Sequence, residues 1–335
     1  MNDPISRLLE ERDVLLIDGA TGTNMFLLGL ANGAPGELWC VDAPEKVRSV
    51  HQGFVDAGSD IILTNTFGAN TFRFALHKLQ GRVRELNMAA AGLAREVADK
   101  ASRKVIVAGS MGPTGDVLEP LGTRTQREAE EAFHEQAEAL RDGGADVAWI
   151  ETMFAENEVE AAVRGVQRAG LPFVLTMTFD TGGRTMMGTR PFDAMRNTKT
   201  LPAQPIAFGA NCGVGPAQLL DSILGIALAA QPGDAIVAKS NCGLPVMGDD
   251  MRVRYDGTPE VMAAYARLAR DAGARLIGGC CGTTAAHVRA MAESLASAPR
   301  GAVPTYEDIE RDVGPVRKVT SRPTRAPARR TTARA

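Results

Sequence analysis

Residues 60–65 read Asp-Ile-Ile-Leu-Thr-Asn, an apolar run that ends in two polar residues. Residues 104–109 form another apolar run, Lys-Val-Ile-Val-Ala-Gly. Nearly continuous apolar runs of this length are typical of strands covered on both faces, as in a parallel sheet. Eight such runs occur along the chain, at residues 14–18, 60–65, 104–109, 146–151, 172–178, 205–211, 234–240 and 275–279.

Longer stretches with apolar residues at helical spacing lie between these runs, for example at 125–140 and 259–272. Alternating strands and helices indicate βαβ units, and eight units in about 300 residues suit a (β/α)8 TIM barrel, the fold that we predict. The alternative is a doubly wound open sheet. Its nucleotide-binding forms are not favoured, because the Gly-rich segment 18–23 lacks dinucleotide spacing and no Gly-Lys-Ser/Thr phosphate loop occurs.

The entries into three of the predicted strands share a short pattern around glycine. Residues 56–60, 142–146 and 271–275 read Asp-Ala-Gly-Ser-Asp, Asp-Gly-Gly-Ala-Asp and Asp-Ala-Gly-Ala-Arg. In each, a glycine stands where a helix would end, so we expect it to adopt a positive φ there.

The composition is that of an ordinary soluble globular protein, with 44% hydrophobic residues and a net charge of −3. This charge argues against nucleic-acid binding, and we see neither a signal peptide nor a membrane span, so a cytoplasmic location is predicted. The five cysteines are then more naturally ligands, reactive thiols or core residues than disulfides. We assign residues 1–310 to the barrel and 311–335 to a basic tail predicted to be disordered.

Polar residues stand just past the apolar runs. They are Asp18, Gly19, Thr64, Asn65, Gly109, Ser110, Glu151, Thr178, Asn211, Cys212, Lys239, Asn241, Cys242, Cys280 and Cys281. Because the active site of an eightfold barrel lies at the C-terminal ends of its strands, this distribution predicts a site built from many strands.

Three cysteines in glycine-rich segments stand out among these residues. Cys212 lies in Gly-Ala-Asn-Cys-Gly, and Cys280 and Cys281 lie in Gly-Gly-Cys-Cys-Gly-Thr-Thr. If their sulfurs converge, three thiolates and one exchangeable position make a catalytic zinc site. The alternatives are buried core cysteines and a vicinal disulfide between Cys280 and Cys281.

The segments 18–23, 64–67, 150–152, 209–213 and 278–284 resemble the homocysteine S-methyltransferase family. They occur in family order within a resemblance that covers about residues 10–300. The chain looks most like the stand-alone bacterial betaine–homocysteine S-methyltransferases. The resemblance implies a (β/α)8 barrel and a Zn²⁺ ion bound by Cys212, Cys280 and Cys281.

The resemblance also implies how homocysteine is held. Asp18, the backbone of Gly19, Thr64 and Glu151 would bind its amino-acid end, which agrees with the preference of an ammonium group for carboxylates. Asn211, beside the first cysteine, is included among the expected substrate contacts. The alternatives are a helix cap for Asp18 and an orienting role for Glu151.

The implied reaction needs no protein nucleophile. A free thiol is mostly protonated at neutral pH, and zinc removes that proton, so the homocysteine thiolate can attack a methyl group and become methionine. Betaine is the favoured donor, and Trp39 occupies a position implied to contact it, although hydrophobic packing is the alternative role. Four aromatic residues are candidates for a cage around a quaternary ammonium group: Trp39, Phe67, Phe72 and Phe154.

Two departures leave the donor open. Gly68 and Thr152 stand where the betaine enzymes have tyrosines, so S-methylmethionine, another sulfonium or a methylcorrinoid are alternative donors. We expect Cys242 to be a bystander rather than a fourth ligand, and no histidine to be catalytic. A zinc hydrolase and a non-enzymatic thiol redox sensor are the competing classes, and a homo-oligomer is possible.

Overall fold

The barrel predicted from the sequence is confirmed. The computed structural model describes residues 3–180, 182–247 and 253–316 of the chain. Its main sheet has eight strands that all pair in parallel, in the order β1-β10-β7-β6-β5-β4-β3-β2. A parallel bridge between Ile17 and Ile61 joins the two ends of this order and closes the barrel. The strands are β1 (Leu15–Leu16), β2 (Ile61–Leu63), β3 (Ile106–Met111), β4 (Val147–Met153), β5 (Phe173–Met177), β6 (Ala207–Cys212), β7 (Ala235–Ser240) and β10 (Ala274–Gly279).

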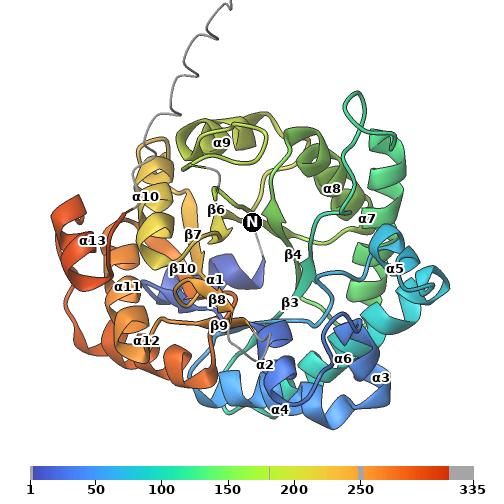
Figure 1. Ribbon diagram of the computed structural model, residues 1–335, viewed down its shortest axis with the longest axis horizontal. Coiled ribbons are helices and arrows are strands. Elements are labelled where there is room, and N and C mark those ends of the chain that lie inside the picture. Colours follow the sequence, from blue (N-terminus) through green and yellow to red (C-terminus); the bar gives the residue numbers. More distant parts are fainter. Residues whose placement is uncertain (1–2, 181, 248–252, 317–335) are drawn as a thin grey trace, which may run out of the picture.

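Helices surround the strands in a ring, which Figure 1 shows in a view along the barrel axis. They are α2 (Thr21–Leu27), α3 (Trp39–Asp42), α4 (Pro44–Asp56), α5 (Thr71–Ala75), α6 (Val83–Lys100), α7 (Gln126–Asp142), α8 (Glu156–Ala169), α9 (Pro191–Asn197), α10 (Pro216–Ala227), α11 (Pro259–Asp271) and α12 (Ala285–Ser297). Among the described residues, three short 3-10 helices lie in the connections: η1 (Gly36–Leu38), η2 (Gln80–Arg82) and η3 (Thr198–Thr200). No helix in the described ranges combines the length and the apolar character needed to cross a membrane.

Strand β2 explains why the apolar runs are continuous. Ile61 and Leu63 belong to the core inside the barrel, whereas Ile62 belongs to the core between the strands and the helices. Side chains alternate along a strand, so a strand between two apolar layers needs apolar residues at every position. Helix α1 (Pro4–Glu11) adds Ile5 and Leu9 to the inner core.

The glycine pattern at the strand entries is also confirmed. Gly58, Gly144 and Gly273 have φ values of 109°, 102° and 106°. This is the left-handed region that favours glycine, and it turns the chain from each helix into the following strand.

Two elements were not predicted. A two-stranded antiparallel hairpin of β8 (Pro245–Met247) and β9 (Val253–Tyr255) follows β7. Helix α13 (Tyr306–Asp312) packs against α10 and α11 and crosses the predicted boundary between residues 310 and 311. Most of the predicted disordered tail, residues 317–335, lies outside the described residues.

Candidate metal centre

The three cysteines singled out from the sequence lie together. Cys212 is the last residue of β6, and Cys280 and Cys281 directly follow β10. Strands β6 and β10 flank β7, and both Cys212 and Gly279 pair with Ser240 of that strand. As a result, the Sγ atoms of Cys212, Cys280 and Cys281 lie within 4.8 Å of one another.

This sulfur cluster fits a soft metal ion. Tetrahedral ligands at the usual zinc–sulfur length of about 2.3 Å lie roughly 3.8 Å apart, which is compatible with the observed spacing. Thiolates favour zinc or copper(I) over magnesium or calcium. Within the described residues the cysteines form no disulfide, so the vicinal pair is free to bind an ion.

Cys212 is directed toward the cluster by an unusual backbone conformation. Its φ is 63°, and the following Gly213 has a φ of 76°. A left-handed conformation is rare for a residue with a side chain and is found preferentially at functional sites. Here it ends β6 and turns the chain away from the strand at the cysteine itself.

Asn211 stabilises this region through contacts within the protein. Its Oδ1 accepts hydrogen bonds from the backbone N–H of Thr152 and the hydroxyl of Thr176, both at 2.8 Å. Its Nδ2 donates to Thr152 Oγ1 and lies 3.9 Å from Cys280 Sγ. These contacts make Asn211 a positioning residue in this structure, and its direct contact with a substrate stays a prediction.

Asn241 connects the two cysteine segments, a role that the sequence did not reveal. Its Nδ2 donates to the Gly213 carbonyl at 2.6 Å, and its Oδ1 accepts from the Cys281 N–H at 3.0 Å. The Cys280 N–H donates to the carbonyl of Ser240 at 2.5 Å. The end of β7 therefore holds both segments in place.

The three thiols do not share their protons equally. Hydrogen bonds from Cys212 and Cys280 lower the pKa of Cys281. The pKa of Cys212 is raised, first by its hydrogen bonds to Cys280 and Cys281 and then by burial. Cys281 is therefore the sulfur that ionises most readily, and a bound cation would favour ionisation of all three.

Lys239 places a positive charge beside the cluster. It is 4% exposed, and its Nζ lies 3.7 Å from Glu151 Oε2. Burial lowers the pKa of Lys239, but the negative charges of Glu151, Cys280 and Asp18 raise it more, so the net shift is upward and the side chain stays charged. A lysine at the end of the otherwise apolar run of β7 was the sequence signal for this residue.

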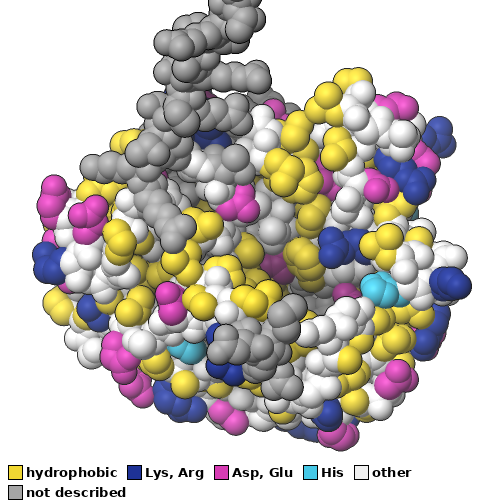
Figure 2. All heavy atoms as spheres, in the orientation of Figure 1, with side chains coloured by type: hydrophobic (Ala, Val, Ile, Leu, Met, Phe, Trp, Pro, Cys, Tyr) yellow, Lys and Arg dark blue, Asp and Glu magenta, His cyan; other side chains and the backbone are white. Residues whose placement is uncertain are grey.

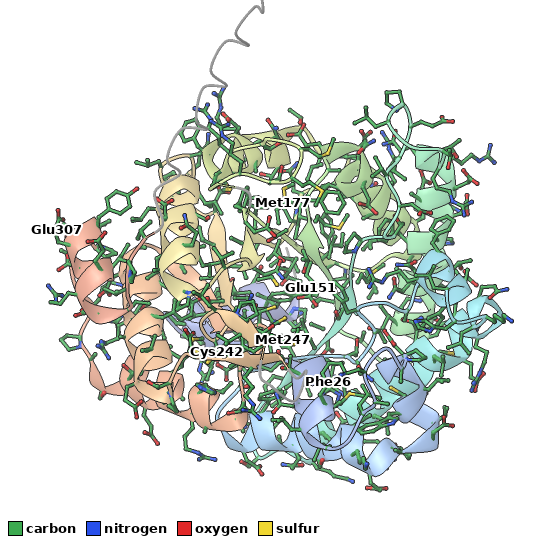
Figure 3. All side chains as sticks on the ribbon, viewed as in Figure 1. Phe26, Glu151, Met177, Cys242, Met247 and Glu307 are labelled. Atoms are coloured by element: carbon green, nitrogen blue, oxygen red, sulfur yellow. The ribbon has the colours of Figure 1, made fainter. Side chains whose placement is uncertain are left out.

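Asp18 and Glu151 lie at the same end of the barrel, and Figure 3 shows Glu151 near its centre. Asp18 is fully buried, and its Oδ2 accepts from the Leu63 N–H at 2.7 Å. Its Oδ1 has no hydrogen-bond partner among the described residues. Burial raises the pKa of Asp18 to about 7, although Lys239 opposes the shift. An unpaired buried carboxylate oxygen is costly, so it is suited to accept from a ligand ammonium group.

The remaining predicted substrate residues surround these carboxylates. The Ser110 hydroxyl donates to Glu151 Oε1 at 2.6 Å, and the Ser110 N–H donates to Thr64 Oγ1 at 3.0 Å. A Cβ atom at Gly19 would lie 2.5 Å from the carbonyl oxygen of Thr283, so only glycine fits there. The residue that caps α2 is Ala20, which removes the helix-cap interpretation of Asp18.

The predicted aromatic cage is largely taken up by cations of the protein. Lys46 Nζ lies 4.3 Å from the Trp39 ring centroid. Arg73 and Arg124 lie over Phe67 and Phe72, at 5.4 and 4.6 Å from the ring centroids. Gly112 packs so closely on Phe67 that a Cβ atom there would lie 2.5 Å from the ring. Phe154 lines a separate small cavity of about 40 Å³.

The mouth of the barrel has an apolar rim. Large hydrophobic side chains are exposed on the connections that follow β1, β3, β5 and β7: Phe26, Leu27, Val117, Leu121, Met186, Met187, Val246 and Met247. Figure 2 looks onto this face and shows hydrophobic side chains around its centre.

Cys242 is not part of the sulfur cluster. It is buried, its Sγ donates to the carbonyl of Gly257 at 3.0 Å, and it lies 3.1 Å from His287 Nε2. His287 therefore contacts Cys242, which the sequence did not reveal. Nothing in these contacts points to a fourth protein ligand.

Residues 15–295 match the sequence model of the homocysteine S-methyltransferase family. The chain therefore belongs to this family of methyltransferases, and the resemblance seen in its motifs is confirmed. Membership favours a methyltransferase over the hydrolase and redox-sensor alternatives.

Individual relatives agree with this assignment. The chain is 32% identical to the methionine synthases of Mycobacterium leprae, over 310 residues, and Mycobacterium tuberculosis, over 303 residues. These matches cover 88% and 86% of this chain but 25% of each synthase, so the chain spans about a quarter of the length of the curated relatives it matches.

A solved structure extends the likeness to three dimensions. The metallated form of the homocysteine methyltransferase MmuM from Escherichia coli superposes with a TM-score of 0.72 at 26% identity. The match covers 86% of this chain and 99% of the MmuM chain. The oxidized form of the same protein gives a TM-score of 0.73.

Proposed function

We propose that this chain transfers a methyl group to the sulfur of homocysteine, which gives methionine, and that it holds zinc through Cys212, Cys280 and Cys281. The observation that carries the proposal is the approach of three thiol sulfurs to within 4.8 Å of one another at the C-terminal ends of the barrel strands. Family membership supports homocysteine as the acceptor.

The residues beside the cluster are suited to bind an amino acid. Asp18 Oδ1 lacks a partner in the described structure and would accept a hydrogen bond from the ammonium group of homocysteine. Glu151 is a second carboxylate. Burial raises its pKa, and Lys239, whose Nζ lies 3.7 Å away, opposes this shift and favours the ionised form. Both carboxylates are held in fixed positions by their hydrogen bonds to Leu63 and Ser110.

Zinc at the three cysteines would make a protein general base unnecessary. Cys212, Cys280 and Cys281 would hold zinc, which would lower the pKa of the homocysteine thiol so that it gives its proton to solvent and becomes a nucleophile. In the transfer, a carbon–sulfur bond forms to homocysteine while the bond from the methyl carbon to the donor breaks. The electron pair of that broken bond leaves with the donor.

Betaine is the donor that the sequence resemblance favours, but the rings give it little support. Trp39, Phe67 and Phe72 each carry a lysine or arginine side chain on one ring face, so a donor cation cannot use those faces unless the protein cation moves. Trp39 also packs against the buried residues Cys40 and Val47. S-methylmethionine, another sulfonium or a methylcorrinoid are therefore proposed beside betaine, with no aromatic cage required.

The test is methionine formation by the purified, zinc-loaded protein. Homocysteine is supplied with betaine, S-methylmethionine, dimethylsulfoniopropionate or a methylated corrinoid, and methionine is measured by mass spectrometry. We expect one donor to give methionine, and Cys281→Ser to abolish it. Zinc-loaded protein that makes no methionine with any donor would contradict the proposal.

The remaining expectations about the protein's setting stay predictions. They are a cytoplasmic location, small-molecule partners limited to homocysteine and the methyl donor, no nucleic-acid partner and a possible homo-oligomer.

A further inference from the structure

Among the polar residues that stand just past the apolar runs, Lys239 is the only one with a positive charge. In β7, Val237 belongs to the core inside the barrel and Ala238 to the core between the strands and the helices. Side chains alternate along a strand, so the Lys239 side chain points into the barrel, as that of Val237 does. Lys239 pairs with Asn211 on one side and with Gly278 on the other, and both of these strands lead into clustered cysteines.

The ammonium group of Lys239 has fewer contacts than its burial requires. The residue is 4% exposed, and its only ion pair within the described part of the chain joins Nζ to Glu151 Oε2 at 3.7 Å. Glu151 lies on β4, which Figure 1 shows across the barrel from β7. The distance exceeds the roughly 3.2 Å limit of an N–H···O hydrogen bond. A buried charge is costly unless it is hydrogen bonded, so this ammonium is suited to donate to a closer acceptor.

Asp18 provides the complementary charge one strand away. Its carbonyl oxygen accepts from the Gly279 N–H at 3.0 Å, and Gly279 follows Gly278, the residue of β10 that pairs with Lys239. Its carboxylate oxygen Oδ1 has no hydrogen-bond partner among the described residues. A free acceptor and an ammonium with free donors therefore lie beside the same strand. An amino acid carries both matching groups, an ammonium and a carboxylate, on a single carbon atom.

We propose that Lys239 binds the carboxylate of homocysteine while Asp18 accepts from its ammonium group, so that Lys239 makes the site selective for an amino acid over a simple aminothiol. Without the lysine, the carboxylates of Asp18 and Glu151 would attract an ammonium group but repel a carboxylate. The inference rests on the proposed function, because it takes homocysteine as the methyl acceptor.

A lysine that only balances the charge of Glu151 makes a different prediction, since its removal would affect every thiol ligand alike. The compound 3-aminopropane-1-thiol is homocysteine without its carboxylate, so it separates the two roles. Lys239→Met keeps an unbranched side chain and removes the charge. Lys199→Met is the matched control, because Lys199 forms an ion pair with Asp234, which directly precedes β7 at the opposite end of that strand.

The experiment titrates the zinc-loaded full chain with homocysteine and with 3-aminopropane-1-thiol by calorimetry. We expect wild type and Lys199→Met to bind homocysteine more tightly than the aminothiol. Lys239→Met should bind homocysteine roughly ten- to a hundredfold more weakly than wild type, because a charge-assisted hydrogen bond is lost. It should bind the aminothiol at least as tightly as wild type does. The zinc content of all three proteins should be equal.

The possible failures are distinguishable. An unchanged affinity of Lys239→Met for homocysteine, or an equal loss for both thiols, would overturn the role of Lys239 and leave the proposed function intact. Equal affinities of the wild type for the two thiols would also overturn it, and this comparison does not depend on the folding of any variant. Failure of the zinc-loaded wild type to bind homocysteine would contradict the proposed function and this inference with it.

Discussion

Cys212 ends β6 in a left-handed conformation, with a φ of 63°. Thr152, which follows Glu151 in β4, has the same φ. Asn211 directly precedes Cys212 in the chain. Its side chain accepts a hydrogen bond from the Thr152 N–H and donates one to the Thr152 hydroxyl. Strain at two residues with side chains is tolerated only when the surroundings fix them, and here the fixed geometry directs one sulfur toward the cluster.

The first prediction concerns the ligands themselves. Cys212→Ser, Cys280→Ser and Cys281→Ser should each lose most of the bound zinc, because a serine hydroxyl is a poor replacement for a thiolate. Cys242→Ala is the matched control and should keep full zinc, since its sulfur contacts Gly257 instead. Metal analysis of the four purified variants decides the point, and full zinc in all three serine variants would refute the assignment.

The second prediction concerns the carboxylates. Asp18→Asn and Glu151→Gln should weaken homocysteine binding by roughly ten- to a hundredfold, because the loss of one charge-assisted hydrogen bond costs on the order of 1.5–3 kcal/mol. Zinc content should not change, since the thiol ligands are untouched. Calorimetric titration with homocysteine measures the effect. Unchanged affinity in both variants would show that these carboxylates do not bind the substrate.

At the scale of single residues, part of the site could be predicted from the sequence. The glycines around Cys212, Cys280 and Cys281 marked them as unusual, and the structure brings the three together. The role of Asn241 could not be predicted, because it depends on contacts with Gly213 and Cys281, which lie 28 and 40 positions away in the sequence. Lys239 was visible as a charge at a strand end, but its pairing with Glu151 was not.

At the scale of elements, β7 organises the site although it carries none of the three clustered sulfurs. It lies between the two cysteine-bearing strands, and Asn241 at its end contacts both cysteine segments. Register between neighbouring strands therefore decides whether the sulfurs meet. A shift of one residue along β7 would remove the pairing of both Cys212 and Gly279 with Ser240.

The third prediction follows from this arrangement. Asn241→Ala should lower zinc affinity about tenfold or more, because residues that orient metal ligands typically contribute ten- to a hundredfold. Asn197→Ala is a suitable control, since Asn197 is exposed and donates to Glu156, which has no contact with the three cysteines among the hydrogen bonds of the described residues. Competition with a chromophoric chelator gives the affinities. Equal affinities in the two variants would show that the Asn241 contacts are not needed.

The eight barrel strands were predictable because burial on both faces makes them apolar throughout. The β8–β9 hairpin was not, because all three residues of β8 are exposed and carry no pattern of burial. Helix α13 begins with a capping box at Thr305 and Asp308 but buries few residues, which explains why it was divided by the predicted boundary. Weak burial therefore limits what the sequence reveals about both elements.

At the scale of the whole molecule, a buried histidine should make stability depend on pH. His51 in α4 is fully buried, and neither ring nitrogen has a hydrogen-bond partner among the described residues. Burial lowers its pKa to about 4 from 6.5. The unfolded chain then binds a proton before the folded protein does, so the stability falls as the pH drops from 6.5 toward 4.

The fourth prediction uses this shift. The contribution of His51 to the loss is about 3 kcal/mol in the free energy of unfolding, because each pKa unit corresponds to about 1.4 kcal/mol. Urea unfolding at pH 7 and pH 4.5 should show a clearly smaller loss in His51→Leu than in wild type. His77→Leu is the control, because His77 is exposed and its replacement should leave the pH dependence as in wild type. A His51→Leu variant with the wild-type pH dependence would contradict the prediction.

The central claim is that three cysteine sulfurs hold a metal ion that receives the sulfur of homocysteine. X-ray absorption at the zinc edge measures this most directly, because it counts sulfur ligands at the metal. We predict three sulfurs and one lighter ligand in the purified protein, and four sulfurs after homocysteine is added. A metal with fewer than three sulfurs, or a sulfur count that homocysteine does not change, would contradict the claim.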